Sequence, residues 1–242
     1  MKKQIFYLTI LSLVICNPIH SQSDPLMFTS FDNAVFDVWQ VVYEQNDKHL
    51  GGKIEQLNKE WLKTKSSISE NAECGRLYCD SFCSDIDFTI SVIGTLAESK
   101  YYHYIEESIL YLTQEFYFLR ERYNNQVYLS DLLWQSYKLS FEINEAADDQ
   151  MLDLLEWNEF ENKFCQLQQY WQSYKYEINE INTVLSEQEQ SIINGVEASI
   201  SQFEEKMMLA NRKEIIIPAS DLKASIATSI ITYHINPIEI EF

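Results

Sequence analysis

Apolar side chains recur along most of this chain at alternating steps of three and four residues, the spacing of one face of an α-helix. The longest row runs without a miss over residues 157–185, about four heptads on a single helix. Further rows occupy residues 105–123 and 196–210, and two shorter rows, 31–42 and 50–68, are separated by a slip in the spacing. Aromatic rings take part in these rows, which is typical of core positions rather than of a cofactor site.

Turn-forming residues are scarce over the same stretch. From Leu26 to Ile217 the chain has no proline, and its glycines are Gly51, Gly52, Gly75, Gly94 and Gly195. A β-rich domain of this length would need more turn residues, whereas long helices would not. The pattern therefore predicts an all-α fold: an up-down bundle of long antiparallel helices with a short extended C-terminal tail.

Polar clusters predict where the helices are interrupted. We expect a loop over residues 69–84, with Ser84 as the N-cap of a long helix that continues to Tyr123. Residues 124–126 predict a turn, and residues 146–149 a kink or a short break. Ser186 and Glu189 have the spacing of a capping box, which predicts a new helix at that point.

The C-terminal part is predicted to mix a short helix with extended segments. Pro218 is expected to restart a last helix, because proline is tolerated in the first helical turn. Residues 215–217 and 238–242 are expected to be extended and to pair, since 238–242 alternates apolar and polar side chains and 215–217 does so less clearly.

An internal repeat is also expected. A shift of 110 residues superposes six identical residues within 16 positions. They are Lys53, Gln56, Leu57, Trp61, Lys65 and Ile68 on Lys163, Gln166, Leu167, Trp171, Lys175 and Ile178. We therefore predict one domain over residues 22–242, in which two tandem helical-hairpin halves, 28–145 and 150–236, pack together to bury their apolar rows.

The first 21 residues have the order of a secretory signal peptide. Two lysines precede an apolar run over residues 5–16, and Asn17-Pro18 ends that run. The run is too short to span a membrane, and no later apolar run approaches about 18 residues. The chain is expected to be exported to the periplasm or the extracellular space; a form lipidated at Cys16 is the alternative.

The net charge of the mature chain indicates which classes of partner are expected. Removing the signal takes two of the 18 basic residues and none of the 37 acidic ones, which leaves a net charge of 16 − 37 = −21. Such a surface repels phosphate backbones and anionic lipid, so nucleic-acid binding and membrane-surface roles are not expected. It favours solubility and is compatible with a cationic partner.

The four cysteines that remain after export predict disulfide bonds. Antiparallel pairing across the turn at 124–126 would place Cys165 level with Ile86, close to Cys83. Cys83–Cys165 is therefore the favoured long-range bridge and Cys74–Cys79 the local one. A metal-thiolate site is less favoured, because the spacings differ from those of zinc knuckles.

The histidines raise a metal hypothesis. The same pairing would place His103 level with Asp148 and Asp149, and pairing across the first loop would bring His49 to a similar height. His103, however, lies about 200° around the helix from the apolar row, which favours an exposed position. A metal site on His49, His103, Asp148 and Asp149 is thus the minor interpretation, as is haem ligation by Met207, which belongs to an apolar row.

Catalytic and cofactor motifs are not found in the sequence. It has no Cys-x-x-Cys-His, no Gly-rich phosphate loop, no His-Glu-x-x-His and no Gly-x-Ser-x-Gly. The preferred hypothesis is an exported, non-enzymatic helical bundle without a cofactor that acts through protein contacts. The alternative hypothesis is a metal- or haem-binding four-helix-bundle carrier.

Overall fold

The computed structural model describes residues 26–70, 76–124, 128–149, 154–181, 185–209 and 211–235. These residues form eight α-helices and no strand. The helices are α1 (Leu26–Tyr43), α2 (Asp47–Glu70), α3 (Arg76–Glu98), α4 (Tyr102–Asn124), α5 (Leu129–Asp148), α6 (Leu154–Ile181), α7 (Glu187–Met207) and α8 (Arg212–Ile235). The predicted all-α class and antiparallel bundle are confirmed.

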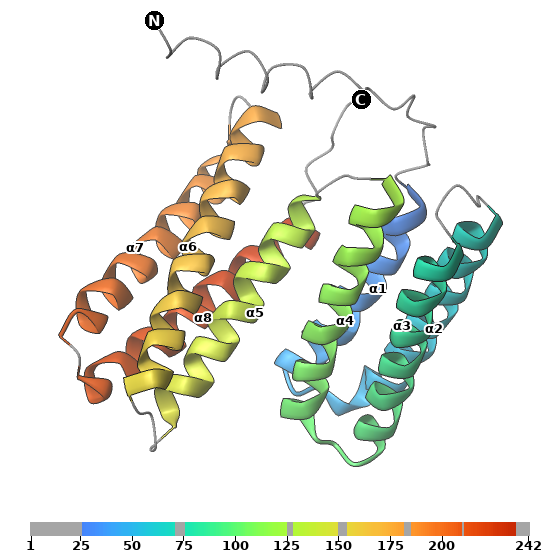
Figure 1. The fold of residues 1–242 in the computed structure, drawn as a ribbon, viewed down its shortest axis with the longest axis horizontal. Helices are drawn as coiled ribbons and strands as arrows, with labels where there is room; N and C mark the ends of the chain where they lie inside the picture. The colour runs from blue at the N-terminus through green and yellow to red at the C-terminus, as the bar shows by residue number, and fades with distance from the viewer. Residues whose placement is uncertain are drawn as a thin grey trace, which may run out of the picture.

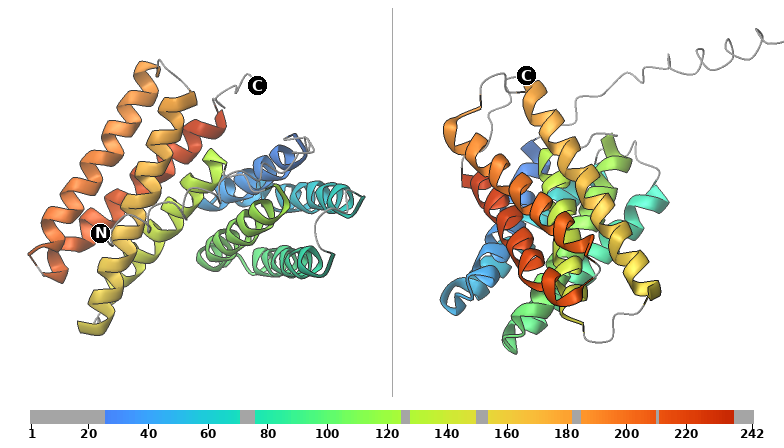
Figure 2. Two further views of the ribbon diagram at one scale, coloured as in Figure 1. Left: turned by 45° about the horizontal axis from the view of Figure 1, so that its top comes forward. Right: turned by 90° about the vertical axis from the view of Figure 1, so that its left-hand side faces the viewer.

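The helices pack in two groups of four (Figure 1). In the first group α1 contacts α2 and α4, and α3 contacts α2 and α4, which closes a four-helix bundle. In the second group α8 lies between α5 and α7, and α6 lies beside α5. Contacts of α1 with α8 and of α4 with α5 join the groups, which lie side by side in Figures 1 and 2.

Large aromatic side chains fill the interior of both groups. Trp39, Trp61, Trp134 and Trp171 are all fully buried, as the apolar spacing predicts. Trp39 makes edge-to-face contacts with Trp134 and Tyr137, at ring-centroid distances of 5.4 and 5.2 Å. Because Trp39 belongs to α1 and the other two rings to α5, this cluster also packs the two groups against each other.

Two chain reversals were not predicted from the sequence. The helix expected from Asp85 to Tyr123 is divided into α3 and α4, and the first pair of apolar rows is divided into α1 and α2. Lys100 and Gln45, at these reversals, have φ angles of 56° and 53°, the left-handed region that glycine usually occupies. The prediction of one long helix was wrong because neither reversal uses glycine or proline.

The predicted boundaries of α3 and α8 also need correction. Residues 76–84 belong to α3 rather than to a loop, and the Ser84 hydroxyl donates back to the Asp80 carbonyl at 2.8 Å instead of capping a helix. Residues 215–217 are helical, because α8 begins at Arg212 and continues through Pro218. Burial of Ile215 against the core offsets the one backbone hydrogen bond that Pro218 removes. Residues 238–242 lie outside the described part.

The capping box predicted before α7 is confirmed. The Glu189 backbone N–H donates to the Ser186 hydroxyl at 3.2 Å, and the Ser186 N–H donates to the Glu189 carboxylate at 2.7 Å. These reciprocal bonds satisfy two backbone donors at the start of the helix. The N-terminus of α8 is also capped by a side chain, since the Lys213 N–H donates to the Asn211 side-chain oxygen at 3.2 Å.

Within the described part of the chain, one helix is long and apolar enough to cross a membrane by length and composition alone. It is residues 212–234 of α8, with a mean hydropathy of 1.3 and 44% of its most apolar window buried. Its apolar side chains pack between α5 and α7, as those of a core helix do. Core helices of soluble bundles have the same length and composition, so α8 is only weak evidence for a membrane span.

The 110-residue shift has a counterpart in the ion pairs between helices. Lys65 of α2 pairs with Asp87 of α3, and Lys175 of α6 pairs with Glu197 of α7, each partner 110 residues further along. The tryptophans one turn earlier, Trp61 and Trp171, are equally buried. Tandem duplication and the boundaries of its halves stay predictions. The predicted first half, residues 28–145, includes most of α5, but α5 packs against α6 and α8 of the second group.

Candidate functional site

The structure does not gather the predicted metal ligands. His49 is exposed on α2, and His103 of α4 pairs with Glu145 of α5 at 3.7 Å and stacks on Phe141. Among the described residues, no group of three or more histidine, cysteine and acidic side chains has the arrangement of a metal site.

The remaining candidate ligands lie elsewhere. Asp148 and Asp149 are exposed at the end of α5, where Arg212 donates to the backbone carbonyls of Ala147 and Asp148. Met207, the candidate haem ligand, packs against the core at the end of α7. The structure therefore gives the metal and haem hypotheses no assembled site within its described residues.

Cys83 and Cys165 are free thiols in the structure, so the favoured bridge between them is not formed there. Cys83 is buried in α3 and Cys165 is exposed on α6. Their predicted proximity assumed an unbroken helix over 85–123, which the reversal at Lys100 replaces with two helices. Cys74 and the side chain of Cys79 lie outside the described part, so a bridge between them stays a prediction.

A buried ion cluster lies where the two groups of helices meet. The Arg120 guanidinium of α4 pairs with Asp32 of α1 and Asp131 of α5. The Ser130 hydroxyl also donates to Asp32, at 3.2 Å. The guanidinium carbon lies 4.8 Å from the ring centroid of Tyr128, which shields the charges from solvent. Such a cluster holds α1, α4 and α5 in position relative to one another.

A second polar cluster joins α4, α5 and α8. The Tyr137 hydroxyl donates to the Glu106 carboxylate, and the Lys223 ammonium lies 3.2 Å from the same carboxylate. Burial, and then the Glu106 charge, raise the pKa of Tyr137 well above its usual range, so its hydroxyl stays protonated. Lys223 also lies over the Phe141 ring at 4.4 Å. This cluster is satisfied internally and is best explained as structural.

The outer face of α3 and α4 carries unusually exposed aromatic rings. Phe88 is 71% exposed, Tyr104 54% and Tyr111 46%. Phe88 lies ten residues before the end of α3 and Tyr111 nine residues after the start of α4, so antiparallel packing places them level. Burial first, and then charges that include Asp85 of α3, raise the pKa values of Tyr111 and Glu115 of α4, so Asp85 lies close to both side chains. We call Phe88, Tyr104 and Tyr111 the aromatic face.

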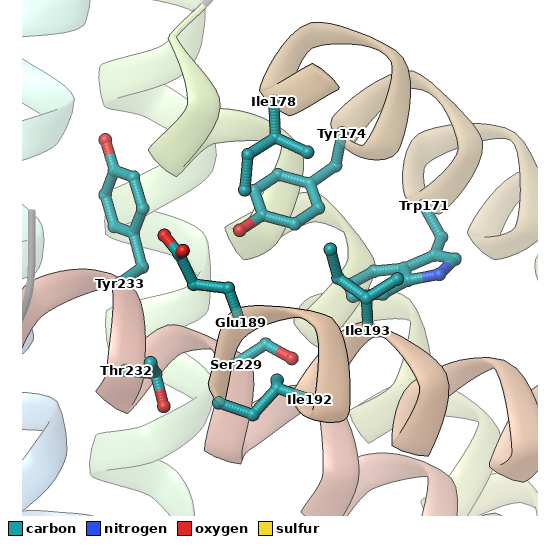
Figure 3. Close-up of a pocket in the computed structure, with 9 residues that line it drawn as sticks. All are labelled: Trp171, Tyr174, Ile178, Glu189, Ile192, Ile193, Ser229, Thr232 and Tyr233. Carbon is teal, nitrogen blue, oxygen red and sulfur yellow. The ribbon is translucent and has the colours of Figure 1, made fainter. Parts of the chain in front are cut away.

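A pocket opens between α6, α7 and α8 in the second group (Figure 3). It is a shallow recess with an interior of about 20 Å³, room for a water molecule or two, and it is partly open to solvent. Its lining residues are Trp171, Tyr174, Ile178, Glu189, Ile192, Ile193, Ser229, Thr232 and Tyr233. Glu189 is the one charged residue among them.

The polar groups of this pocket are few and partly unused. Glu189 accepts the Ser186 N–H as part of the capping box, and the Ser229 and Thr232 hydroxyls donate to carbonyls of their own helix. The hydroxyls of Tyr174 and Tyr233 make no hydrogen bond with the described residues. Figure 3 shows the Tyr174 hydroxyl and the Glu189 carboxylate pointing into the same space.

The two tyrosines of the pocket are held in their neutral form. Burial raises the pKa of Tyr233 to about 12, with the Asp32 charge adding to the effect. Burial also raises the pKa of Tyr174 well above its ordinary value, with smaller contributions from Tyr233 and Glu189. Both therefore present neutral phenol rings and hydroxyl donors at physiological pH.

Sequence reasoning did not identify this pocket. Trp171, Tyr174 and Ile178 were assigned to the apolar row of one helix, which is where they lie, and Glu189 was recognised only as a capping residue. Two tyrosines were the available sequence signal for the pocket. Tyr174 replaces Thr64, its counterpart under the 110-residue shift, and Tyr233 lies near the end of α8. Their convergence depends on how α6, α7 and α8 pack.

Comparison with known proteins adds no assignment. No protein family matches the chain, and neither the curated proteins nor the solved structures compared with it give a significant match.

Proposed function

We propose that this chain is an exported, non-enzymatic helical-bundle protein that acts through contacts with another protein. The observation that carries the proposal is the aromatic face on α3 and α4, where Phe88 and Tyr111 lie level and are 71% and 46% exposed. Aromatic side chains are enriched in the cores of protein interfaces, and exposed apolar patches commonly mark such sites. Export rests on the predicted signal peptide, residues 1–21, which lies outside the described residues.

The charge around the aromatic face indicates the chemistry of the partner. Asp85 and Glu115 lie near Tyr111, and the whole chain has a net charge of −19. A partner that places apolar side chains on the rings would gain from lysine or arginine opposite these carboxylates. We therefore propose a protein partner with a basic rim around an apolar patch.

The test compares capture by three versions of the full chain. The wild type, a Phe88→Ser/Tyr111→Ser variant and a Tyr176→Ser control are immobilised and exposed to the exported fraction of the source cells. Tyr176 is a suitable control because it is 63% exposed on α6, away from α3 and α4.

Support requires one protein that the wild type and Tyr176→Ser retain and the double variant loses. With that protein purified, the double substitution is expected to weaken the complex at least about tenfold, as loss of one or two interface anchors does. Equal capture by the double variant, or capture of no protein, would overturn the proposal.

A further inference from the structure

A second row of side chains runs along the outer surface of α4 and begins just before it. The members of this outer row, at alternating steps of three and four residues, are Tyr101, Tyr104, Ser108, Tyr111, Glu115 and Phe118. The outer row lies about 100° around the helix from the buried row of residues 105–123. Tyr101 and Tyr104 are 57% and 54% exposed, and their rings meet edge to face at a centroid distance of 6.1 Å. Because a helix that is apolar on several sides is normally covered on each of them, the outer row indicates a missing neighbour.

The adjacent helix α3 contributes side chains to the same surface. The Phe82 ring of α3 contacts the Phe118 ring of α4 at a centroid distance of 6.4 Å, and Asp85 lies close to Glu115. These two pairs have the register that also places Phe88 level with Tyr111. At the rise of an α-helix, the outer row extends over about 25 Å, the length of roughly five helical turns.

From this surface we infer that the aromatic face binds an amphipathic helix of the partner, laid along α3 and α4, whose apolar row carries a lysine or arginine near its middle. The inference rests on the proposed function, because it specifies the partner of the same face. It adds the secondary structure of the bound segment and the position of its charge.

The mode of binding follows from the backbone and from the residues between the rings. Both elements are α-helices, whose backbone groups bond within the helix, so no sheet edge is available to which a strand could be added. Ser108 lies between Tyr104 and Tyr111, and its hydroxyl donates to the Tyr104 carbonyl at 2.8 Å. A small residue with a satisfied hydroxyl between two large rings gives room for a large apolar side chain of an approaching helix.

The charges on this surface indicate a cation in the partner. Asp85 and Glu115 lie one helical turn from Phe88 and Tyr111, within the length of the outer row. Burial raises the pKa of Glu115 and the Asp85 charge raises it further, while the Tyr111 hydroxyl acts in the opposite direction. No described lysine or arginine is among the groups that act on Glu115. A lysine or arginine of the partner would relieve the repulsion between these two carboxylates.

The test uses three synthetic peptides of about 18 residues, long enough to cover the outer row. The first carries leucines at steps of three and four along one helical face, with lysines at the middle of that row. The second replaces the lysines with glutamates, and the third has the composition of the first in an order without the row. Isothermal titration of the full chain is expected to show the first peptide binding at least about tenfold more tightly than the other two. Circular dichroism is expected to show that the first peptide gains helix when it binds.

Variants of the full chain locate the site. Phe88→Ser/Tyr111→Ser is expected to weaken binding of the first peptide about tenfold. Asp85→Asn/Glu115→Gln is expected to weaken it about fivefold at low salt and less at high salt. The matched control is Glu177→Gln/Glu180→Gln, which removes the same charge from exposed positions of α6 and is expected to leave binding within about twofold. Circular dichroism of each variant verifies that it is folded.

The outcomes separate the helix from other occupants. Equal binding of the first and third peptides, equal effects of the two charge variants, or no binding of the first peptide at millimolar concentration would each overturn the inference. If the peptide fails while Phe88→Ser/Tyr111→Ser still loses a captured protein, the partner binds in another mode and the proposed function stands; failure of both contradicts the proposed function as well. Self-association of the wild type that this double variant abolishes would identify a second copy of the chain as the occupant and would also overturn the inference.

Discussion

Arg120 of α4 and Asp131 of α5 form an ion pair in which both side chains are 1% exposed. It joins the first group of helices to the second, and Asp32 of α1 completes it from the far side of the guanidinium. Asp131 has a further role, because its carboxylate accepts the Tyr128 N–H at 3.1 Å at the start of α5. The junction between the groups is therefore polar at its centre and surrounded by aromatic rings.

Removing the cation from this junction should destabilise the protein strongly. Arg120→Met leaves Asp32 and Asp131 without their shared partner, and loss of one member of a buried ion pair costs about 3–5 kcal/mol. Urea unfolding followed by circular dichroism measures the difference. Arg122→Met is the matched control, because Arg122 is exposed on the same helix and should cost no more than about 0.5 kcal/mol. Similar costs for the two variants would contradict the structural role given to Arg120.

Trp61 and Trp171, which the 110-residue shift superposes, should differ in how much stability the protein loses when their indole N–H group is removed. The Trp61 indole N–H donates to Asp87 at 2.6 Å, whereas the buried Trp171 N–H has no hydrogen-bond partner among the described residues. Trp61→Phe should therefore cost about 1 kcal/mol more unfolding free energy than Trp171→Phe, because both lose similar volume but only one loses a hydrogen bond. Denaturation midpoints of the two variants decide the matter, and a larger cost at Trp171 would count against the bonding described.

His234 should make the protein less stable in mild acid. Burial lowers its pKa from 6.5 to about 4, although Asp32 and Asp37 act in the opposite direction. Its stabilising contribution is therefore complete above pH 6.5 and is lost as pH falls from about 6.5 toward 4, where the unfolded state binds the proton first. The His234 ring is stacked on Phe36 at 4.2 Å and lies beside Asn33, a site that favours the neutral ring.

The measurement compares unfolding midpoints at pH 7 and pH 4.5. His234→Phe should reduce the loss of stability between these two pH values, while His49→Gln, at an exposed histidine, should leave the loss as in the wild type. An NMR titration of the His234 ring reports its pKa directly. A titration midpoint above pH 6 for the His234 ring would contradict the statement that burial lowers its pKa.

The two described cysteines should differ in reactivity. Burial raises the pKa of the Cys83 thiol, which disfavours the reactive thiolate, whereas Cys165 is exposed. Iodoacetamide should therefore modify Cys165 in the native, unreduced protein and reach Cys83 only after denaturation. Peptide mass mapping identifies the labelled residues. If neither thiol reacts until a reductant is added, the predicted Cys83–Cys165 bridge is present and the free thiols of the structure are contradicted.

Local sequence was sufficient where the governing interactions are local. The helical spacing around Trp61 and Trp171 predicts their burial, and the Ser186–Glu189 spacing predicts the cap of α7, because both depend on residues three or four positions apart. The register of α4 and α5 followed from the turn at 124–126, since antiparallel helices fix which residues face each other. His103 accordingly lies beside Glu145, one helical turn from the predicted Asp148.

Tertiary structure decided the reversals and the sites. At Gln45 and Lys100 the chain turns without glycine or proline, and the slip in the apolar spacing between residues 42 and 50 is the one local signal the rows contain for either turn. Arg120 meets Asp32, 88 positions away, only because α1 and α4 pack side by side. The pocket likewise depends on Tyr174, Glu189 and Tyr233 converging from three helices. The apolar rows state which face of each helix is buried but not which helix covers it, because any apolar row can pack against any other.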